Sequence, residues 1–368
     1  MAASYAARLT KGVDYGVCGL PETKDSPRVL AVKLKKLVEL FKTSKHIVVH
    51  TGAGVSTSCG IPDFRGPSGV WTLEKQGRIE DAGGAPWKDV VPSVTHMALA
   101  ALAERGIVKY VVTQNVDGLH LKSGFTPGKI SELHGNVFRE SCEQCQKVFV
   151  RDFDIQTIGF AYTGRKCDEC GGKLIDFLLD WEDALPEDEL ERAVEECKTA
   201  DLAVCLGTSL RVTPANSLPL KTVKRGGKLV IVNLQATPKD KTSNLKISAT
   251  CDEVLCHLMK MLEIPIPSYK SVPGAIVQKK YNDFLRLERA KRKERDSDDE
   301  ALGRKSKRQK QSEHGTESSD DSDFEEESEF SPDPEDEDDP SYDGSGDNHQ
   351  VVLTRHQRKE ALLANNDV

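Results

Sequence analysis

The sequence predicts an α/β protein with a doubly wound parallel (Rossmann-like) sheet, a smaller zinc-ribbon module and a disordered C-terminal tail. Short runs rich in β-branched residues alternate with helical patterns, two closely spaced cysteine pairs interrupt that alternation, and the end of the chain is polar and highly charged. Strands that are apolar on both faces, with helices between them, are typical of a parallel sheet covered on both sides.

Four apolar runs are expected to form the strands of this sheet. They are residues 46–50 (HIVVH), 108–112 (VKYVV), 202–206 (LAVCL) and 228–232 (KLVIV). Apolar residues at helical spacing predict the helices between them. These helices are residues 29–43, 96–105, 187–197 and 252–262.

Glycine and small hydrogen-bonding residues follow each predicted strand. The segments are 51–54 (TGAG), 113–118 (TQNVDG), 207–209 (GTS) and 233–235 (NLQ). One such segment alone would be interpreted as an ordinary turn. Because open α/β sheets bind ligands at the carboxyl ends of their strands, the four together predict a nucleotide crevice.

The segment 52–56 (GAGVS) lies where a dinucleotide fingerprint is expected. Its glycines would let the backbone approach a pyrophosphate, whose charge the N-terminus of a following helix would stabilise. However, Thr57 takes the place of the third glycine, and no acidic residue ends the second strand, so Asn233 or Asp117 would have to hold the ribose. The motif indicates bound NAD without the geometry of a hydride-transfer enzyme, which disfavours a dehydrogenase.

Two CxxC pairs, separated by 21 residues, predict a metal site. Their members are Cys142, Cys145, Cys167 and Cys170. Four thiolates at this spacing form a closed tetrahedral site for structural zinc, which supports the fold and does not catalyse. The alternative, a redox-active dithiol pair, fits poorly with Gly171 and Gly172 directly after the second pair.

Charge is distributed unevenly along the chain, although the net charge is only -8. Residues 286–310 contain 11 basic and 6 acidic side chains, and residues 317–343 contain 15 acidic and no basic ones. We expect 290–368 to be disordered, because a composition so poor in aliphatic residues cannot offset the entropy of ordering. The clusters KRKER (291–295) and RKSKRQK (304–310) resemble a bipartite nuclear import signal, although short basic runs are also frequent by chance.

Composition excludes other classes of protein. The mean hydropathy is -0.47 and no apolar run reaches about 18 residues, so a transmembrane helix is not expected. The first twenty residues lack the apolar stretch of a signal peptide. With no export signal, ten cysteines indicate a reducing compartment.

Several long motifs together resemble the sirtuins, a family of NAD-dependent protein-lysine deacylases. They occur in the family's order: GAGVSTSCGIPDFRG (52–66), TQNVDGLH (113–120), ELHGN (132–136), the two cysteine pairs, GTSL (207–210) and VNLQ (232–235). WEDALP (181–186) and the N-terminal segment are similar to the nuclear, chromatin-associated sirtuin-6 type. The second cysteine pair departs from that type, because CDEC is compact where a longer loop is expected.

The resemblance implies domains and site residues. It implies a catalytic domain over residues 1–270, with a large lobe at about 25–139 and 175–265 and a zinc module at about 140–174, followed by a tail over 271–368. It places NAD against Ala53, Thr57, Asp63, Phe64, Arg65, Trp71, Gln114, Asn115, Asp117, His134, Gly207, Ser209, Asn233, Gln235 and Cys251. For Asp63 and Arg65, the alternative is a salt bridge at a surface loop.

His134 is the general base that the resemblance implies. In the family's mechanism the acyl oxygen of the modified lysine attacks the ribose and expels nicotinamide. The histidine then deprotonates a ribose hydroxyl, and lysine and O-acyl-ADP-ribose are released. An imidazole with an ordinary pKa near 6.5 is largely neutral at pH 7 and can accept this proton.

The expected function is therefore deacylation of lysine in histones or other nuclear proteins, including removal of acetyl and of long acyl chains. Basic segments could also contact DNA or nucleosomes, and no membrane association is expected. Two alternatives remain open at this stage. One is protein mono-ADP-ribosyl transfer, and the other is a zinc-ribbon chromatin adaptor with little turnover.

Overall fold

A computed structural model of the chain describes residues 2–271 and 274–312. Within them the chain forms two units, one that extends to Tyr281 and one that begins at Asn282. The first unit contains two sheets. The described part of the second unit is the continuation of helix α9 (Gly274–Ser312), whose first turns belong to the first unit.

The larger sheet has six strands, all parallel, in the order β10-β9-β8-β1-β2-β3. They are β1 (Ile47–Thr51), β2 (Val108–Thr113), β3 (Ile130–Glu132), β8 (Leu202–Leu206), β9 (Lys228–Val232) and β10 (Leu245–Ile247). The four predicted strands are the four central ones, so the predicted fold class is confirmed. The sequence analysis missed the edge strands β3 and β10, because three residues are too short to show a pattern.

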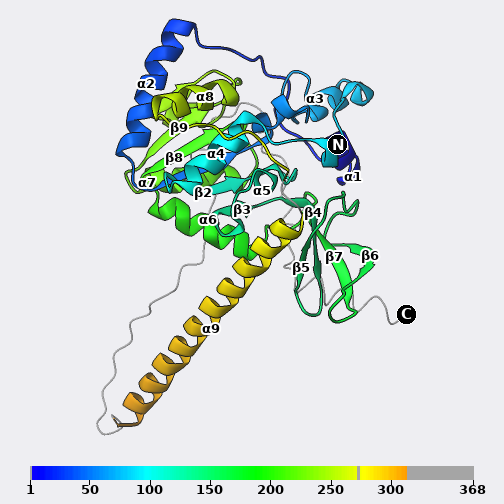
Figure 1. Ribbon diagram of the computed structural model, residues 1–368, viewed down its shortest axis with the longest axis vertical. Coiled ribbons are helices and arrows are strands. Elements are labelled where there is room, and N and C mark those ends of the chain that lie inside the picture. The colour runs from blue at the N-terminus through cyan, green and yellow to red at the C-terminus, as the bar shows by residue number, and fades with distance from the viewer. Residues whose placement is uncertain (1, 272–273, 313–368) are drawn as a thin grey trace, which may run out of the picture. The chain divides into compact units, whose positions relative to one another are not determined.

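Helices cover both faces of this sheet (Figure 1). On one side lie α2 (Pro27–Thr43), α4 (Val94–Glu104) and α8 (Cys251–Met261), and on the other α6 (Glu187–Thr199) and α7 (Leu218–Lys224). The predicted helices 29–43, 96–105, 187–197 and 252–262 match four of these to within two residues at each end. In α2, the five buried residues Leu30, Leu34, Leu37, Val38 and Phe41 recur at helical spacing and form its core-facing stripe.

Short helices and turns connect these elements. The α-helices are α1 (Ala2–Arg8), α3 (Val70–Lys75) and α5 (Leu119–Lys122). The 3₁₀ turns are η1 (Ala53–Val55), η2 (Thr57–Cys59), η3 (Ile79–Asp81), η4 (Trp87–Asp89), η5 (Pro127–Lys129), η6 (Ala215–Ser217) and η7 (Asp240–Thr242). Several of them follow strand ends, where they shape the edge of the larger sheet.

The smaller sheet is antiparallel and has the order β5-β4-β7-β6. Its strands are β4 (Gly135–Cys142), β5 (Val148–Val150), β6 (Tyr162–Lys166) and β7 (Lys173–Leu178). The four cysteines lie in and between these strands, as a zinc-bearing module requires. We call this element the zinc-bearing sheet.

The prediction of disorder over 290–368 is contradicted over residues 290–312, whereas residues 313–368 lie outside the described residues. Residues 274–312 form helix α9, so the basic segment 286–310 is helical, while the acidic segment 317–343 lies outside the described residues. Lys, Arg, Glu, Gln, Ala and Leu are all good helix formers, and a helix pairs its own backbone groups without needing a core. Ion pairs one turn apart support it, such as Lys291 with Glu288 at 2.9 Å.

In residues 2–271 and 274–312, no helix combines the length and the apolar character that crossing a bilayer requires.

Candidate functional site

A cavity of about 470 Å³ lies at the carboxyl edge of the larger sheet. Its wall includes residues that follow β1, β2, β8 and β9. The glycine and small hydrogen-bonding residues after these four strands predicted a crevice at this edge. Of the fifteen residues expected to bind NAD, the structure brings twelve together in this wall. They are Ala53, Asp63, Phe64, Arg65, Trp71, Gln114, Asn115, His134, Gly207, Ser209, Asn233 and Gln235.

The glycine loop (residues 52–56) packs with its backbone directly against the backbone of the loop that follows β8. The N–H of Gly54 donates to the carbonyl of Gly207 at 2.9 Å, and a Cβ on Gly54 would lie 2.7 Å from the Gly207 Cα. Gly207 itself has a φ of +58°, which favours glycine. These glycines therefore allow the two loops to touch, in addition to lining the cavity.

The expected helix after this loop is absent from the described structure at that place. Residues 53–59 form only the two 3₁₀ turns η1 and η2. The N–H groups of Val55 and Ser56 donate to the carbonyls of Gly52 and Ala53. Such short turns carry little dipole, so the expected helix N-terminus is not present at this loop, and the binding of a pyrophosphate there stays a prediction. Among the residues that line the cavity, one side chain carries a positive charge.

Arg65 supplies that charge. Its guanidinium carbon lies 4.4 Å from the centre of the Trp71 ring, and its Nε donates to the carbonyl of Tyr15 at 3.3 Å. Burial lowers the pKa of Arg65 to about 10, so the side chain stays charged at neutral pH. A planar guanidinium held in this way offers a fixed fork of donors to a phosphate.

Asp63 fixes the loop that carries Arg65. Its Oδ1 accepts the N–H of Gly66 at 2.8 Å, and burial raises the pKa of this carboxyl. The backbone of the same loop continues the attachment, because the carbonyls of Asp63 and Phe64 accept the N–H groups of Val70 and Trp71. Asp63 thus stabilises the conformation of the loop that carries Arg65.

His134 lies at the joint between β3 and β4, with its ring in the cavity wall. Its Nδ1 is 3.1 Å from the carbonyl oxygen of Gln114. A carbonyl can only accept, so Nδ1 carries the proton and Nε2 keeps a free lone pair. Burial lowers the pKa of His134 to about 4, so the ring is neutral at pH 7. The hydrogen bond from Nδ1 therefore leaves Nε2 as the nitrogen that can accept a proton.

Three predicted NAD residues do not line the cavity. Thr57 is exposed on η2, and Cys251 is buried at the start of α8, where burial raises the pKa of its thiol to about 12. Asp117 is buried behind the wall and accepts the hydroxyl of Ser56 at 2.7 Å and the N–H of Leu119 at 2.9 Å. Asp117 therefore braces the glycine loop from within.

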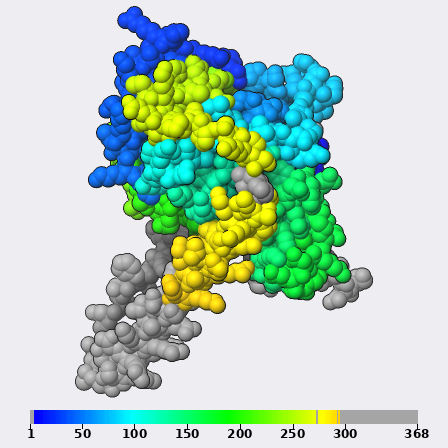
Figure 2. Space-filling model, viewed as in Figure 1, coloured from blue at the N-terminus to red at the C-terminus, as the bar shows by residue number. Residues whose placement is uncertain are grey.

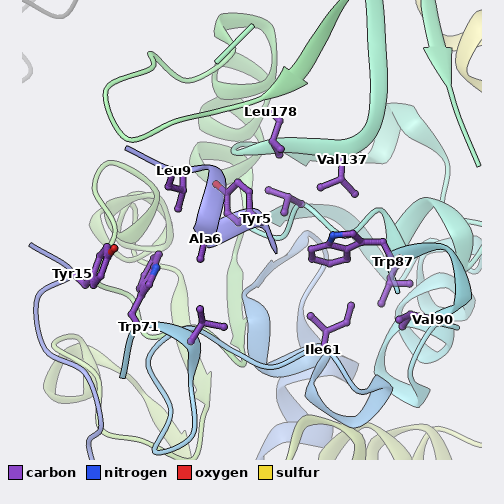
Figure 3. Close-up of a cluster of buried hydrophobic side chains, with 13 residues drawn as sticks. Tyr5, Ala6, Leu9, Tyr15, Ile61, Trp71, Trp87, Val90, Val137 and Leu178 are labelled. Atoms are coloured by element: carbon purple, nitrogen blue, oxygen red, sulfur yellow. The ribbon is translucent and has the colours of Figure 1, made fainter. Parts of the chain in front are cut away.

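The sequence analysis missed one wall of the cavity. It contains Tyr5 and Leu9 near the N-terminus, together with Leu179, Trp181, Leu185, Val212 and Pro214. Tyr5 lies in a buried cluster with Val137 and Leu178 of the zinc-bearing sheet and with Trp71 of α3 (Figure 3). Only WEDALP (181–186) hinted at this wall, because contacts between chain segments so far apart leave no local pattern.

The four cysteine sulfurs lie together at one end of the zinc-bearing sheet. All four lie within 4.8 Å of one another, with Cys142 and Cys170 at 3.3 Å and Cys145 and Cys167 at 3.6 Å. A tetrahedron with Zn–S bonds of about 2.3 Å has edges of about 3.8 Å, close to these separations. The donor set therefore fits a closed structural zinc site, with no position left open for a substrate.

The chain is similar in sequence to known NAD-dependent deacetylases. Residues 84–214 match the model of the Sir2 family. An NAD-dependent protein deacetylase, SRT1, of Oryza sativa subsp. indica is 51% identical over 271 residues, which are 73% of this chain and 56% of that protein. The chain thus spans little more than half the length of this plant relative.

Animal relatives and solved structures are similar as well. The NAD-dependent protein deacetylase Sirt6 of Drosophila melanogaster is 46% identical, over 76% of this chain and 91% of that protein. Human sirtuin-7, also an NAD-dependent protein deacetylase, is 41% identical over 67% of this chain and 64% of its own. A solved complex of Sir2 with a p53 peptide and NAD⁺ has a TM-score of 0.51 and 36% identity, and covers 63% of this chain and 99% of its own.

Proposed function

The chain belongs to the Sir2 family, the sirtuins, which use NAD, and we propose that it removes acyl groups from lysine side chains of histones or other nuclear proteins in an NAD-dependent reaction. The products would be the free lysine, nicotinamide and O-acyl-ADP-ribose. The observation that carries this proposal is the position of His134, with its free Nε2 in the wall of a cavity that also contains Arg65 and the glycine loop.

The side chains divide the proposed work between them. Arg65 would hold the pyrophosphate, with Ala53 and Gly207 giving it room. Cleavage of a glycosidic bond develops positive charge on the sugar carbon, and Phe64 would keep water away from it. His134 would then take a proton from a ribose hydroxyl through Nε2, a role that contributes about 10²–10⁴-fold in enzymes.

The apolar wall is suited to the acyl group. Leu9, Leu179, Trp181, Leu185 and Val212 contribute apolar side chains to the lining of the cavity, which also includes Asp180 and Asp183. An acetyl group would leave part of this surface uncovered, whereas each further buried CH₂ would add about 0.8 kcal/mol of binding. We therefore propose that long acyl chains are substrates in addition to acetyl.

We further propose a division of the chain into a catalytic domain over 1–270, with its zinc module at about 140–174, and a C-terminal segment over 271–368. Nuclear localisation and contact with DNA or nucleosomes would reside in the basic segment 286–310. Lys and Arg on one helix can neutralise phosphates, and such binding weakens steeply as salt rises. The resemblance of WEDALP (181–186) and of the N-terminal segment to the nuclear sirtuin-6 type supports a nuclear role.

Mass spectrometry of products tests the proposal. Purified protein with NAD is incubated with a panel of histone peptides that carry acetyl or long-chain acyl-lysine. We expect nicotinamide, deacylated peptide and O-acyl-ADP-ribose in equal amounts, all dependent on His134. ADP-ribose attached to protein in the absence of acyl-lysine would favour the transferase instead, and binding of nucleosomes without any product would favour an adaptor.

A further inference from the structure

The start of α9 contacts two parts of the first unit through side chains that the proposed reaction does not use. We propose that residues 278–281 form a C-terminal clamp, which holds the edge of the zinc-bearing sheet and the loop of His134 together. In this proposal Tyr281 is a positioning residue for that loop. The clamp lies beyond residue 270, where the sequence analysis ended the folded domain, and beyond the family match over 84–214. Only its effect on turnover rests on the proposed function.

Gln278 pairs with the edge of the zinc-bearing sheet. Its Nε2 donates to the carbonyl of Val148 at 2.7 Å, and its Oε1 accepts the N–H of Val150 at 2.8 Å. These residues lie in β5, the outer strand of that sheet, whose outward edge would otherwise present unpaired groups. One amide side chain thus takes the place of a neighbouring strand, and the start of α9, in yellow, lies against the green surface of this sheet (Figure 2).

Tyr281 covers a buried arginine. The guanidinium carbon of Arg139, on β4, lies 4.7 Å from the centre of the Tyr281 ring and 3.8 Å from that of Phe177. Tyr281 is 3% exposed and Arg139 5%, so the contact is closed to water. Cation–π contacts strengthen when they are desolvated in this way.

Arg139 in turn binds Glu132, a carboxylate that links the residues on either side of His134. Its Nη1 donates to Oε2 of Glu132 at 2.9 Å, and Asn136 Nδ2 donates to Oε1 of the same carboxylate at 2.6 Å. Glu132 and Asn136 lie two residues before and two residues after His134. One carboxylate therefore closes the loop, and the ion pair that orients this carboxylate lies under the ring of Tyr281.

Glu189 completes the arrangement from α6. Its Oε1 is 3.6 Å from Nη1 of Arg139, and its Oε2 is 2.8 Å from Nη2 of Arg192. The larger sheet, the zinc-bearing sheet and α9 thus converge on one buried cluster of charges. Removing the tyrosine ring would admit water to this cluster, weaken the pair between Arg139 and Glu132, and let the loop and its imidazole move. Displacements of about 1 Å at a reacting group can cost about 10²-fold in rate.

The test compares four variants of the full, zinc-loaded chain. Tyr281→Ala removes the cover, Tyr281→Phe keeps the ring, Gln278→Ala frees the edge of β5, and Ile276→Ala is the matched control, because Ile276 is 48% exposed on the same helix. Two measurements are made on each variant. One is nicotinamide release at varied NAD and acetylated peptide, and the other is amide hydrogen exchange at Val150 and over residues 132–138.

For Tyr281→Ala we expect kcat to fall about tenfold or more while KM for NAD changes less than about twofold, since the cavity wall is intact but the base is displaced. Exchange over 132–138 should rise about tenfold. Tyr281→Phe should keep kcat within about threefold, and Gln278→Ala should raise exchange at Val150 about tenfold. Ile276→Ala should resemble the parent throughout.

The clamp is overturned if Tyr281→Ala matches Ile276→Ala in kcat and in exchange over 132–138. It is also overturned if Gln278→Ala leaves the Val150 amide as protected as in the parent. Should Tyr281→Ala fail to fold, the exchange rate of the Val150 amide in Gln278→Ala still decides. If the parent itself releases no nicotinamide, the proposed function fails, whereas the exchange rates judge the clamp separately.

Discussion

The two sheets of the first unit are stabilised by different chemistry. The central strands of the larger sheet are buried and apolar, with Val48, Val49, Ile231 and Val232 at 0% exposure. The zinc-bearing sheet is smaller. Four cysteine sulfurs lie together at one of its ends, and the carboxylate of Glu140, at 0% exposure, pairs with Arg151 and Arg165. The first sheet therefore depends on apolar burial and the second on a metal and on paired charges. The loop of His134 joins the two, so we expect each type of stabilisation to affect turnover in its own way.

Removal of zinc should give the largest effect. Structural zinc sites in zinc-finger peptides contribute about 10–16 kcal/mol of apparent binding energy, which is also folding energy. We expect Cys167→Ser to unfold the zinc-bearing sheet and lower nicotinamide release more than 100-fold, an order-of-magnitude estimate from that dependence. Zinc content, hydrogen exchange and turnover measure this.

Cys256→Ser is the matched control, because Cys256 is exposed on α8 and outside the cluster. It should keep zinc and activity. Protection of the amides in β1 and β8 should survive in Cys167→Ser. If those amides lose protection together with the zinc-bearing sheet, the two regions do not differ as described.

A cavity in the larger sheet should give the next largest effect. Ile231→Ala in β9 removes a fully buried side chain and should lower the free energy of unfolding by about 2–5 kcal/mol. Zinc affinity should not change, since the residue lies in the other sheet. Val32→Ala, at a position 55% exposed on α2, should change stability by less than about 0.5 kcal/mol. Denaturant unfolding and competition with a chelator measure the two quantities, and weaker zinc binding in Ile231→Ala would contradict the comparison.

Acid should destabilise the first unit through buried histidines. Burial lowers the pKa of His50 and His120 to about 3 and that of His96 to about 4, from an ordinary 6.5. The folded state then binds fewer protons than the unfolded state at pH values below 6.5, so the free energy of unfolding falls as the pH drops from 6.5 toward 4. Glu132 acts in the opposite sense, because burial raises its pKa to about 7.

His50→Leu should reduce this dependence. Between pH 6.5 and 4 the unfolded state binds up to one more proton at His50 than the folded state does. Removing this difference lowers the change in the free energy of unfolding by up to about 1.4 kcal/mol per pH unit. Urea unfolding at several pH values, in constant zinc, measures the slope. A slope equal to that of the parent would mean that His50 does not contribute to the acid sensitivity.

The smallest effect is expected for an ion pair between α1 and the chain near the zinc-bearing sheet. Arg8 binds Asp154 through two bonds, of 3.1 and 2.8 Å. Partly exposed pairs contribute at most about 1 kcal/mol, and less as salt rises. Arg8→Lys should therefore cost under about 1 kcal/mol, and a double-mutant cycle with Asp154→Asn should give a coupling energy that shrinks in high salt. A coupling that does not depend on salt would contradict this assignment.

The same contrast explains what could be predicted from the sequence. The central strands and the cysteine pairs were predictable because each has a local pattern, namely β-branched runs and a fixed spacing of ligands. Twelve of the fifteen residues expected around NAD line one cavity, because four of the segments follow neighbouring parallel strands. Thr57 and Asp117 belong to the same motifs but point elsewhere, since alternate residues of a turn cannot all face one ligand.

Other features could not be predicted, because they depend on contacts between distant segments. Tyr5 and Leu9 lie in one buried cluster with Leu178, the Tyr5 hydroxyl donates to the carbonyl of Leu179 at 3.2 Å, and no pattern near residue 5 indicates these contacts. Helix α9 differs from the predicted disorder because a segment too poor in aliphatic residues to bury a core can still form a helix from charged residues with high helix propensity. Of the α9 side chains whose burial the structure describes, only that of Tyr281 is buried.

The central claim is that NAD lies in the cavity at the carboxyl edge of the larger sheet, with its nicotinamide–ribose bond beside His134. A crystal structure with NAD and an acyl-lysine peptide tests it most directly. We expect a ribose hydroxyl within about 2.6–3.2 Å of Nε2 of His134 and the pyrophosphate within reach of Arg65. A dinucleotide bound outside this cavity, or an imidazole with no ribose hydroxyl near Nε2, would contradict the claim.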